Sequence, residues 1–143
     1  MNLKSMLRSK SPQHPELHKR AHALGDAIMQ IAYPSDDHMG HWARFVPTIT
    51  IACDAEYADA AQRYMPAPRR SFAIAVQILV GDSDLVLSLL ANGDTYPRRE
   101  TLKSRGWKWD GLKWAFPIQA DATADEIVAV ARAEYNALTG NEK

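Results

Sequence analysis

The chain has 143 residues, of which 46% are hydrophobic and 24% are charged, and its formal net charge is zero. This length and composition are typical of one folded domain with a core of its own, so we do not expect a disordered chain. The zero net charge excludes a field of the whole molecule that would draw it to nucleic acid or to a membrane, so electrostatic binding has to be local. The single cysteine, Cys53, excludes an internal disulfide.

The N-terminal segment MNLKSMLRSKSPQHP is basic but lacks the apolar stretch of a signal peptide. No run approaches the roughly 20 apolar residues of a membrane span. We therefore expect a cytoplasmic protein without a membrane partner. Residues 1–14 are interpreted as a flexible basic arm, either a solvated tail or a phosphate contact, and residues 15–140 as a single domain.

Apolar residues spaced three and four apart predict a helix that begins near Pro15. Its buried face would carry Leu17, Ala21, Leu24, Ile28 and Ile31. A polar loop follows, and then residues 45–53, FVPTITIAC, alternate as in a half-buried strand. Asp54 is a plausible N-cap for the alanine-rich helix DAEYADAAQRYM.

Residues 72–80, FAIAVQILV, predict a central strand, and LVLSLLA after the turn GDSD predicts the second arm of its hairpin. The segment NGDTYPRRETLKSRG becomes helical, with Gly106 after the helix end in the left-handed conformation. A second hairpin follows, with Asp110-Gly111 as its turn. The last helix, in DATADEIVAVARAEYNALTG, begins with a capping box of Thr123 and Glu126, and its buried stripe would hold Ile127, Val130, Ala131 and Leu138.

The predicted order is α-β-α-β-β-α-β-β-α. Interleaved helices and strands joined by short turns indicate a single α+β domain with an antiparallel or mixed sheet and about four helices.

No catalytic motif is present: the chain lacks G-x-S-x-G, a Walker A loop and G-x-G-x-x-G. Cys53 ends a predicted strand before a helix, a position that can lower the pKa of a thiol. However, a lone cysteine is usually a small hydrophobic residue of the core. We therefore expect a protein that is not an enzyme.

The histidines offer a weak metal hypothesis. His14, His18 and His22 lie four residues apart in succession, and His38 and His41 form an H-x-x-H pair. Zinc needs three or four converging ligands, which only Cys53, Asp36 and Asp37 could complete, and the chain has neither H-E-x-x-H nor C-x-x-C. We expect no metal and no cofactor.

The segment from Tyr96 to Trp114 concentrates charge and rings. It holds six cations and two carboxylates, a local charge of +4, so the rest of the chain carries −4. It also contains three of the four tryptophans. Basic side chains beside exposed rings suit single-stranded nucleic acid, whereas a small hairpin also needs large rings for its core. We expect Trp109 and Trp114 to be mainly core and Trp107 to be exposed.

The candidate nucleic-acid contacts are therefore the basic residues of this segment and the exposed ring, with Tyr96 as a second stacking ring: Arg98, Arg99, Lys103, Arg105, Trp107, Lys108 and Lys113.

Residues 95–117, which we call the helix–hairpin module, have the pattern K-x-x-G-x-[KR]-W-D…K-x-W-x-x-P. The matching positions are Lys103, Gly106, Lys108, Trp109, Asp110, Lys113, Trp114 and Pro117. This segment resembles a small domain of unknown function found in phage and plasmid primase-like and exonuclease-like proteins, and more distantly the HARP domain of DNA-annealing helicases. It departs from the pattern at Arg105, where those modules often have leucine, and in its short turn. The resemblance implies a strand-helix-hairpin unit associated with DNA transactions.

We therefore expect a small accessory protein of a phage or other mobile element that binds DNA, single-stranded or forked. The alternative is a phage-encoded inhibitor of the anti-CRISPR or anti-restriction type that binds a host defence nuclease complex. Clustered acidic residues would then occupy the nucleic-acid site of that target: Asp36, Asp37, Asp54, Glu56 and Asp59. A third hypothesis is a catalytic or metal domain built on the histidines and Cys53.

Overall fold

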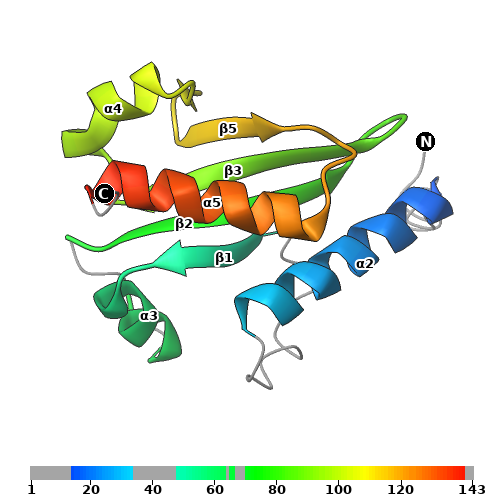
Figure 1. The fold of residues 1–143 in the computed structure, drawn as a ribbon, viewed down its shortest axis with the longest axis horizontal. Coiled ribbons are helices and arrows are strands. Elements are labelled where there is room, and N and C mark those ends of the chain that lie inside the picture. Colours follow the sequence, from blue (N-terminus) through cyan, green and yellow to red (C-terminus); the bar gives the residue numbers. More distant parts are fainter. Residues whose placement is uncertain (1–13, 34–47, 64, 67–69, 141–143) are drawn as a thin grey trace, which may run out of the picture.

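A computed structural model describes residues 14–33, 48–63, 65–66 and 70–140 (Figure 1). The helices of this part are α2 (Pro15–Ala32), α3 (Ala55–Gln62), α4 (Arg99–Ser104) and α5 (Ala124–Thr139), with a 3-10 turn, η2 (Tyr96–Arg98), directly before α4. The strands are β1 (Thr48–Cys53), β2 (Phe72–Val80), β3 (Leu85–Gly93), β4 (Lys108–Trp109) and β5 (Trp114–Ile118).

The five strands form one sheet in the order β1-β2-β3-β5-β4, and every neighbouring pair is antiparallel. Sequential strands that are joined by short turns pair in this way because a tight turn reverses the chain. The predicted single α+β domain and its element order are confirmed, and the sheet is antiparallel rather than mixed.

Helices α2 and α5 lie together on one face of the sheet (Figure 1). On β2 this face carries every second residue, namely Phe72, Ile74, Val76 and Ile78, all of which are buried. They pack with Ile28 of α2 and with apolar residues of α5 in one core. The predicted stripes of both helices are confirmed, since their members are buried in this core or packed against it.

The ends of α5 and α3 are capped as the sequence predicts. In α5, Thr123 accepts from the backbone of Glu126, and the Glu126 carboxylate accepts from the backbone of Thr123. Before α3, the Asp54 carboxylate accepts from the backbone N–H of Tyr57 at 2.8 Å and of Phe72 at 2.8 Å. Asp54 therefore ties the start of α3 to the start of β2.

The β2–β3 hairpin ends in a close backbone approach at Gly93. This residue has a φ of +94°, and a Cβ there would meet the carbonyl oxygen of Ser71 at 2.2 Å. The adjacent N–H of Asp94 donates to the same oxygen at 2.8 Å. Glycine is required here both by the backbone conformation and by the space, and the chain leaves β3 toward η2 from this point.

Strand β1 departs from the predicted alternation. Its pairing with β2 shifts between Thr50 and Ala52, which marks a bulge. The alternation of side chains between the two faces of the sheet is interrupted there. Ile49 and Ile51 are buried, and Cys53 is half-buried. The hydroxyl of Tyr33, at the end of α2, donates to the carbonyl oxygen of Thr50 at 2.6 Å.

Several sequence-based interpretations concern positions outside the described residues: residues 1–13 of the basic arm, Asp36, Asp37, His38 and His41. Within the described ranges, no helix combines the length and the apolar character that a membrane crossing needs.

Candidate nucleic-acid interface

The helix–hairpin module lies at one end of the domain, where α4 stands beside the C-terminal end of α5 (Figure 1). Its strand β5 is hydrogen-bonded to β3, and β4 forms the outer edge of the sheet. The module is therefore part of the main sheet, and one side of it faces the core while the other faces solvent.

Helix α4 ends in a Schellman motif. The N–H of Gly106 donates to the carbonyl of Lys103 at 3.2 Å, and the N–H of Trp107 donates to that of Leu102 at 3.0 Å. Gly106 has the predicted left-handed conformation, with a φ of +94°. This motif commonly brings its last residue against the helix residue five positions before it. It carries Trp107 inward to Leu102, and both side chains belong to the core.

Trp107 is buried, with 2% of its surface exposed. Its ring packs against Phe116 with 5.5 Å between centroids. Its indole Nε1 donates to Glu134 Oε1 on α5 at 2.8 Å. The prediction that Trp107 is the exposed, stacking tryptophan is wrong, because the Schellman motif and the carboxylate of Glu134 draw it into the core.

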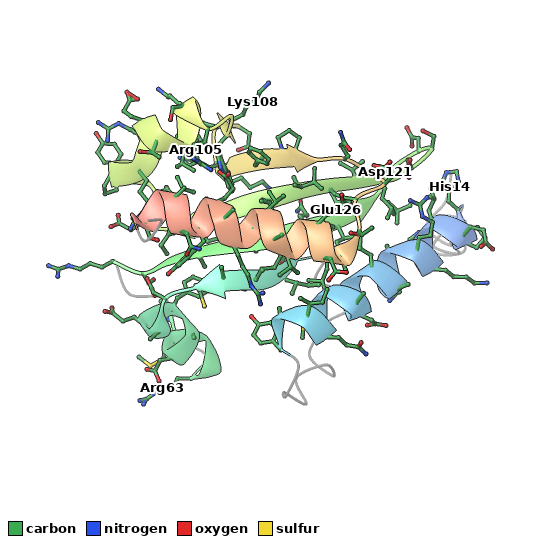
Figure 2. All side chains as sticks on the ribbon, viewed as in Figure 1. His14, Arg63, Arg105, Lys108, Asp121 and Glu126 are labelled. Carbon is green, nitrogen blue, oxygen red and sulfur yellow. The ribbon has the colours of Figure 1, made fainter. Side chains whose placement is uncertain are left out.

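Arg105 binds the same carboxylate in a bidentate manner. Its Nε lies 3.0 Å from Glu134 Oε1 and its Nη2 lies 2.8 Å from Oε2. Figure 2 shows Arg105 between α4 and α5. Burial by itself would raise the pKa of Glu134, but the hydrogen bonds from Arg105 and Trp107 and the charge of Arg105 lower it overall. The carboxylate is therefore held in its charged form, and Arg105 serves the fold.

Arg98 also turns toward the domain. Its Nε donates to the carbonyl oxygen of Leu138 at 3.0 Å, near the C-terminal end of α5, and its Nη1 donates to the carbonyl of Asp94. The guanidinium carbon lies 4.6 Å from the centroid of the Phe72 ring. A cation at a helix C-terminus satisfies carbonyls that have no partner in the helix. Arg98 therefore caps α5, and its donors are directed at the protein.

Trp109 is the exposed tryptophan of the module. It stands directly opposite Trp114 in the β4–β5 pair, and 53% of its surface is exposed. The two rings are 5.5 Å apart between centroids and tilted by 55°. Trp114 is buried at 6%, as predicted. The prediction that Trp109 is mainly core is wrong, because β4 is the edge strand and more than half of the Trp109 surface stays exposed beside the contact with Trp114.

Tyr96 and Arg99 form a second exposed aromatic group. The ring of Tyr96 is 72% exposed. The guanidinium carbon of Arg99 lies 4.0 Å from its centroid, and Arg99 Nη1 donates to the Tyr96 carbonyl at 2.8 Å. Arg99 remains exposed, so it keeps both its charge and its flat surface at the solvent side.

Three lysines of the module, like Arg99, have charged groups that are not directed into the domain. Lys103 is 64% exposed and lies 3.9 Å from Glu100. Lys108 is exposed and Lys113 is half-buried, and Figure 2 shows Lys108 at the outer edge of the molecule. Together with Arg99 they make four outward cations against two carboxylates, Glu100 and Asp110, so the local charge of this side is +2.

The hairpin turn is shifted by one residue from the predicted position. Asp110 and Lys113 are joined by a backbone hydrogen bond of 3.1 Å, so the two loop residues are Gly111 and Leu112. The Asp110 carboxylate accepts the N–H groups of Leu112 and Lys113 at 2.9 Å each, and these bonds lower its pKa. Leu112 stands at the tip with 89% of its surface exposed.

The metal and nucleophile hypotheses gain no support. The described residues contain no group of three or more His, Cys, Asp or Glu side chains able to hold a metal ion. Figure 2 shows His14 at the far end of α2 from the module. Burial and the neighbouring charge of Asp54 raise the pKa of Cys53, so the predicted reactive position does not produce a lowered pKa.

The acidic cluster is only partly available. The Asp54 carboxylate is used by the backbone of Tyr57 and Phe72. Glu56 is exposed, and Asp59 forms an exposed ion pair with Arg63 at 3.2 Å. The structure therefore leaves Glu56 and Asp59 of this cluster at the surface of α3.

Glu134 is the residue that sequence reasoning missed. It follows Ala131 by three positions and precedes Leu138 by four, so it falls on the buried stripe of α5. A carboxylate on an apolar stripe requires a buried partner. That pattern indicates a cation or donor elsewhere in the chain, although it does not say which one.

No family model matches this chain, and neither the curated proteins nor the solved structures include a match.

Proposed function

We propose that this protein is a small, non-catalytic nucleic-acid-binding protein, with DNA as the expected ligand. The contact surface, which we call the outer face, consists of the rings and cations of the helix–hairpin module that are not bonded into the domain: Tyr96, Arg99, Lys103, Lys108, Trp109 and Lys113. Side chains alternate along a strand, so Lys108 and Lys113 lie on the opposite side of the β4–β5 pair from Trp109, and the outer face runs around this edge of the sheet. The observation that carries the proposal is the presence of two exposed rings among four outward cations on one short module. Arg98, Arg105 and Trp107 are not part of this surface, because their polar groups are hydrogen-bonded to α5.

Lysine and arginine neutralise phosphates and release counterions, which favours binding at low salt. Exposed aromatic rings add contacts with bases. Both kinds of side chain lie on η2, α4, β4 and the hairpin, and these are fixed to the main sheet. A binding surface on rigid elements loses less conformational freedom when the ligand binds.

The proposal is tested with Lys103→Glu and a matched control, Lys19→Glu. Both lysines are exposed, at 64% and 77%, and each lies 3.9 Å from a glutamate three residues before it. Binding to a labelled oligonucleotide is measured by fluorescence anisotropy. We expect Lys103→Glu to weaken binding and to reduce the slope of log affinity against log salt by about 1, while Lys19→Glu leaves both unchanged. Equal effects of the two variants, or no binding at micromolar protein, would contradict the proposal.

The cellular context that we propose is that of an accessory protein of a phage or other mobile element, acting in the cytoplasm. Its support is the resemblance of residues 95–117 to modules of phage and plasmid primase-like and exonuclease-like proteins. The nucleic-acid binding in the cytoplasm that this context requires is checked by expressing the protein in bacteria and cross-linking it to nucleic acid in living cells. Recovery of oligonucleotides bound to the outer face is the expected result.

A second candidate function is inhibition of a host defence nuclease complex through protein contacts. It is favoured by the hairpin tip, where Leu112 is 89% exposed beside Trp109 at 53%. Exposed apolar patches often mark protein interfaces, and tryptophan is enriched among the residues that dominate their binding energy. A stable complex with such a nuclease in the absence of nucleic acid, lost in Leu112→Ser, would support it. If Leu112→Ser instead leaves every interaction unchanged, the tip is not a protein contact.

A further inference from the structure

The two ring groups of the outer face are supported from within the module. Trp109 rests against Trp114, which is buried, and is held in register by the β4–β5 pairing. Tyr96 belongs to η2 and carries the Arg99 guanidinium over one face of its ring. The rings are thus in place before any ligand arrives, and more than half of each is exposed to solvent.

Trp109 and Tyr96 lie beyond opposite ends of α4 in the chain. Tyr96 precedes the six residues of α4, and Trp109 follows the turn that ends it. At 1.5 Å per residue the helix itself spans roughly 9 Å. The arrangement therefore offers two separate flat surfaces, one of indole and one of phenol with guanidinium.

The net charge of the outer face is small. Four outward cations face two carboxylates, and Lys103 lies within 3.9 Å of Glu100. A protein that makes about 6–10 phosphate contacts with duplex DNA loses about 10³–10⁵ in affinity between about 50 and 200 mM salt. With at most four cations, the salt dependence on a single strand is limited to a slope of about −3.

We infer that the ligand of the outer face is a single-stranded segment of nucleic acid whose unpaired bases stack on Trp109 and on the Tyr96–Arg99 pair, with stacking rather than charge supplying most of the affinity. This inference rests on the proposed function and deepens it. The bases in a duplex are stacked on one another and offer no free faces to such rings, whereas every unpaired base has one. The single-stranded part of a forked DNA meets the same requirement.

The test compares four labelled ligands of about 20 nucleotides, a length that exceeds typical single-strand site sizes. They are oligothymidylate, oligouridylate, an abasic deoxyribose strand with the same phosphates, and a duplex. Anisotropy is measured with the full chain at about 50 and about 200 mM salt. We expect both base-bearing single strands to bind, and the abasic strand and the duplex to bind at least about tenfold more weakly, since one stacked base is worth roughly that factor.

The outcomes separate the inference from the proposed function. If the abasic strand binds within about threefold of oligothymidylate, charge dominates and the inference fails while nucleic-acid binding stands. If the duplex binds more tightly than oligothymidylate, the inference also fails while nucleic-acid binding stands. If none of the four ligands binds, both proposals fail. The thymidylate and uridylate arms show whether the unpaired strand is DNA, RNA or either.

Variants locate the stacking surface. Trp109→Ala is expected to weaken oligothymidylate binding about tenfold and to leave abasic binding unchanged, while Trp109→Phe restores most of the loss. Leu112→Ala is the control on the same hairpin, because Leu112 is more exposed but has no ring. If Trp109→Ala fails to fold, Tyr96→Ala provides the same comparison at the other end of α4. Equal losses for Leu112→Ala and the ring variants would overturn the assignment.

Discussion

The inward side of the helix–hairpin module and its outer face use the same residue types for different purposes. Arg98 and Arg105 are bonded to α5, whereas Arg99, which directly follows Arg98, lies on an exposed ring. Trp107 is in the core, whereas Trp109, two residues later on the same face of the chain, is half-exposed. Composition thus locates a candidate surface. Hydrogen bonds to α5 and the position of the sheet edge decide which of its arginine and tryptophan side chains reach solvent.

The largest effect is expected from Trp107→Ala. It removes a buried ring that packs against Phe116 and donates to Glu134, so we expect a loss of about 3–5 kcal/mol of unfolding free energy in urea titrations. The matched change Trp109→Ala removes mainly the contact with Trp114 and is expected to cost about 1 kcal/mol. Comparable losses at both positions would mean that the two tryptophans are not divided between core and surface.

Glu134→Gln is expected to come next. The amide keeps the shape of the side chain but removes the negative charge that faces Arg105. It also replaces the carboxylate that accepts hydrogen bonds from both Arg105 and Trp107. Hydrogen bonds that involve a charged group contribute about 1.5–3 kcal/mol each, and we expect a loss of about 2–3 kcal/mol in all. Asp125→Asn, at the exposed start of α5, is the control and is expected to change stability little.

A smaller loss is expected from Arg98→Ala. This change removes the donors to the carbonyls of Leu138 and Asp94 and the contact with the Phe72 ring. We expect it to cost about 1–2 kcal/mol, whereas Arg99→Ala is expected to cost less than about 0.5 kcal/mol. Thermal unfolding distinguishes the two, and an Arg99→Ala protein as unstable as Arg98→Ala would remove the distinction between inward and outward arginines.

A further effect is expected on the pH dependence of stability. The pKa of Glu134 is lower in the folded protein, so the stability it contributes is complete above the ordinary glutamate pKa of about 4.3 and is lost as the pH falls through the lowered value. We expect the difference in unfolding free energy between the wild type and Glu134→Gln to narrow over this acidic range. A difference that is constant with pH would show that the charge of Glu134 does not act on Arg105 and Trp107.

The order of elements was predictable because each helix and strand carries a local signal. Examples are the capping box at Thr123 and the alternation in β2. The burial of Trp107 was also within reach, since a glycine after the helix end implies that the next residue packs against Leu102. The exposure of Trp109 was not, because it depends on β4 being the last strand of the sheet. The partners of Glu134 lie 27 and 29 residues away in the chain, and no local pattern names them.

The hydroxyl of Tyr33 has a consequence for self-association. Strand β1 has only β2 as a neighbour among the described strands, and such an edge is a template on which another chain can add a strand and start aggregation. The phenol from α2 occupies the carbonyl of Thr50, and the bulge beside it breaks the regular spacing that an added strand needs. The Tyr33 side chain thus helps to prevent a further strand from adding to this edge of the sheet.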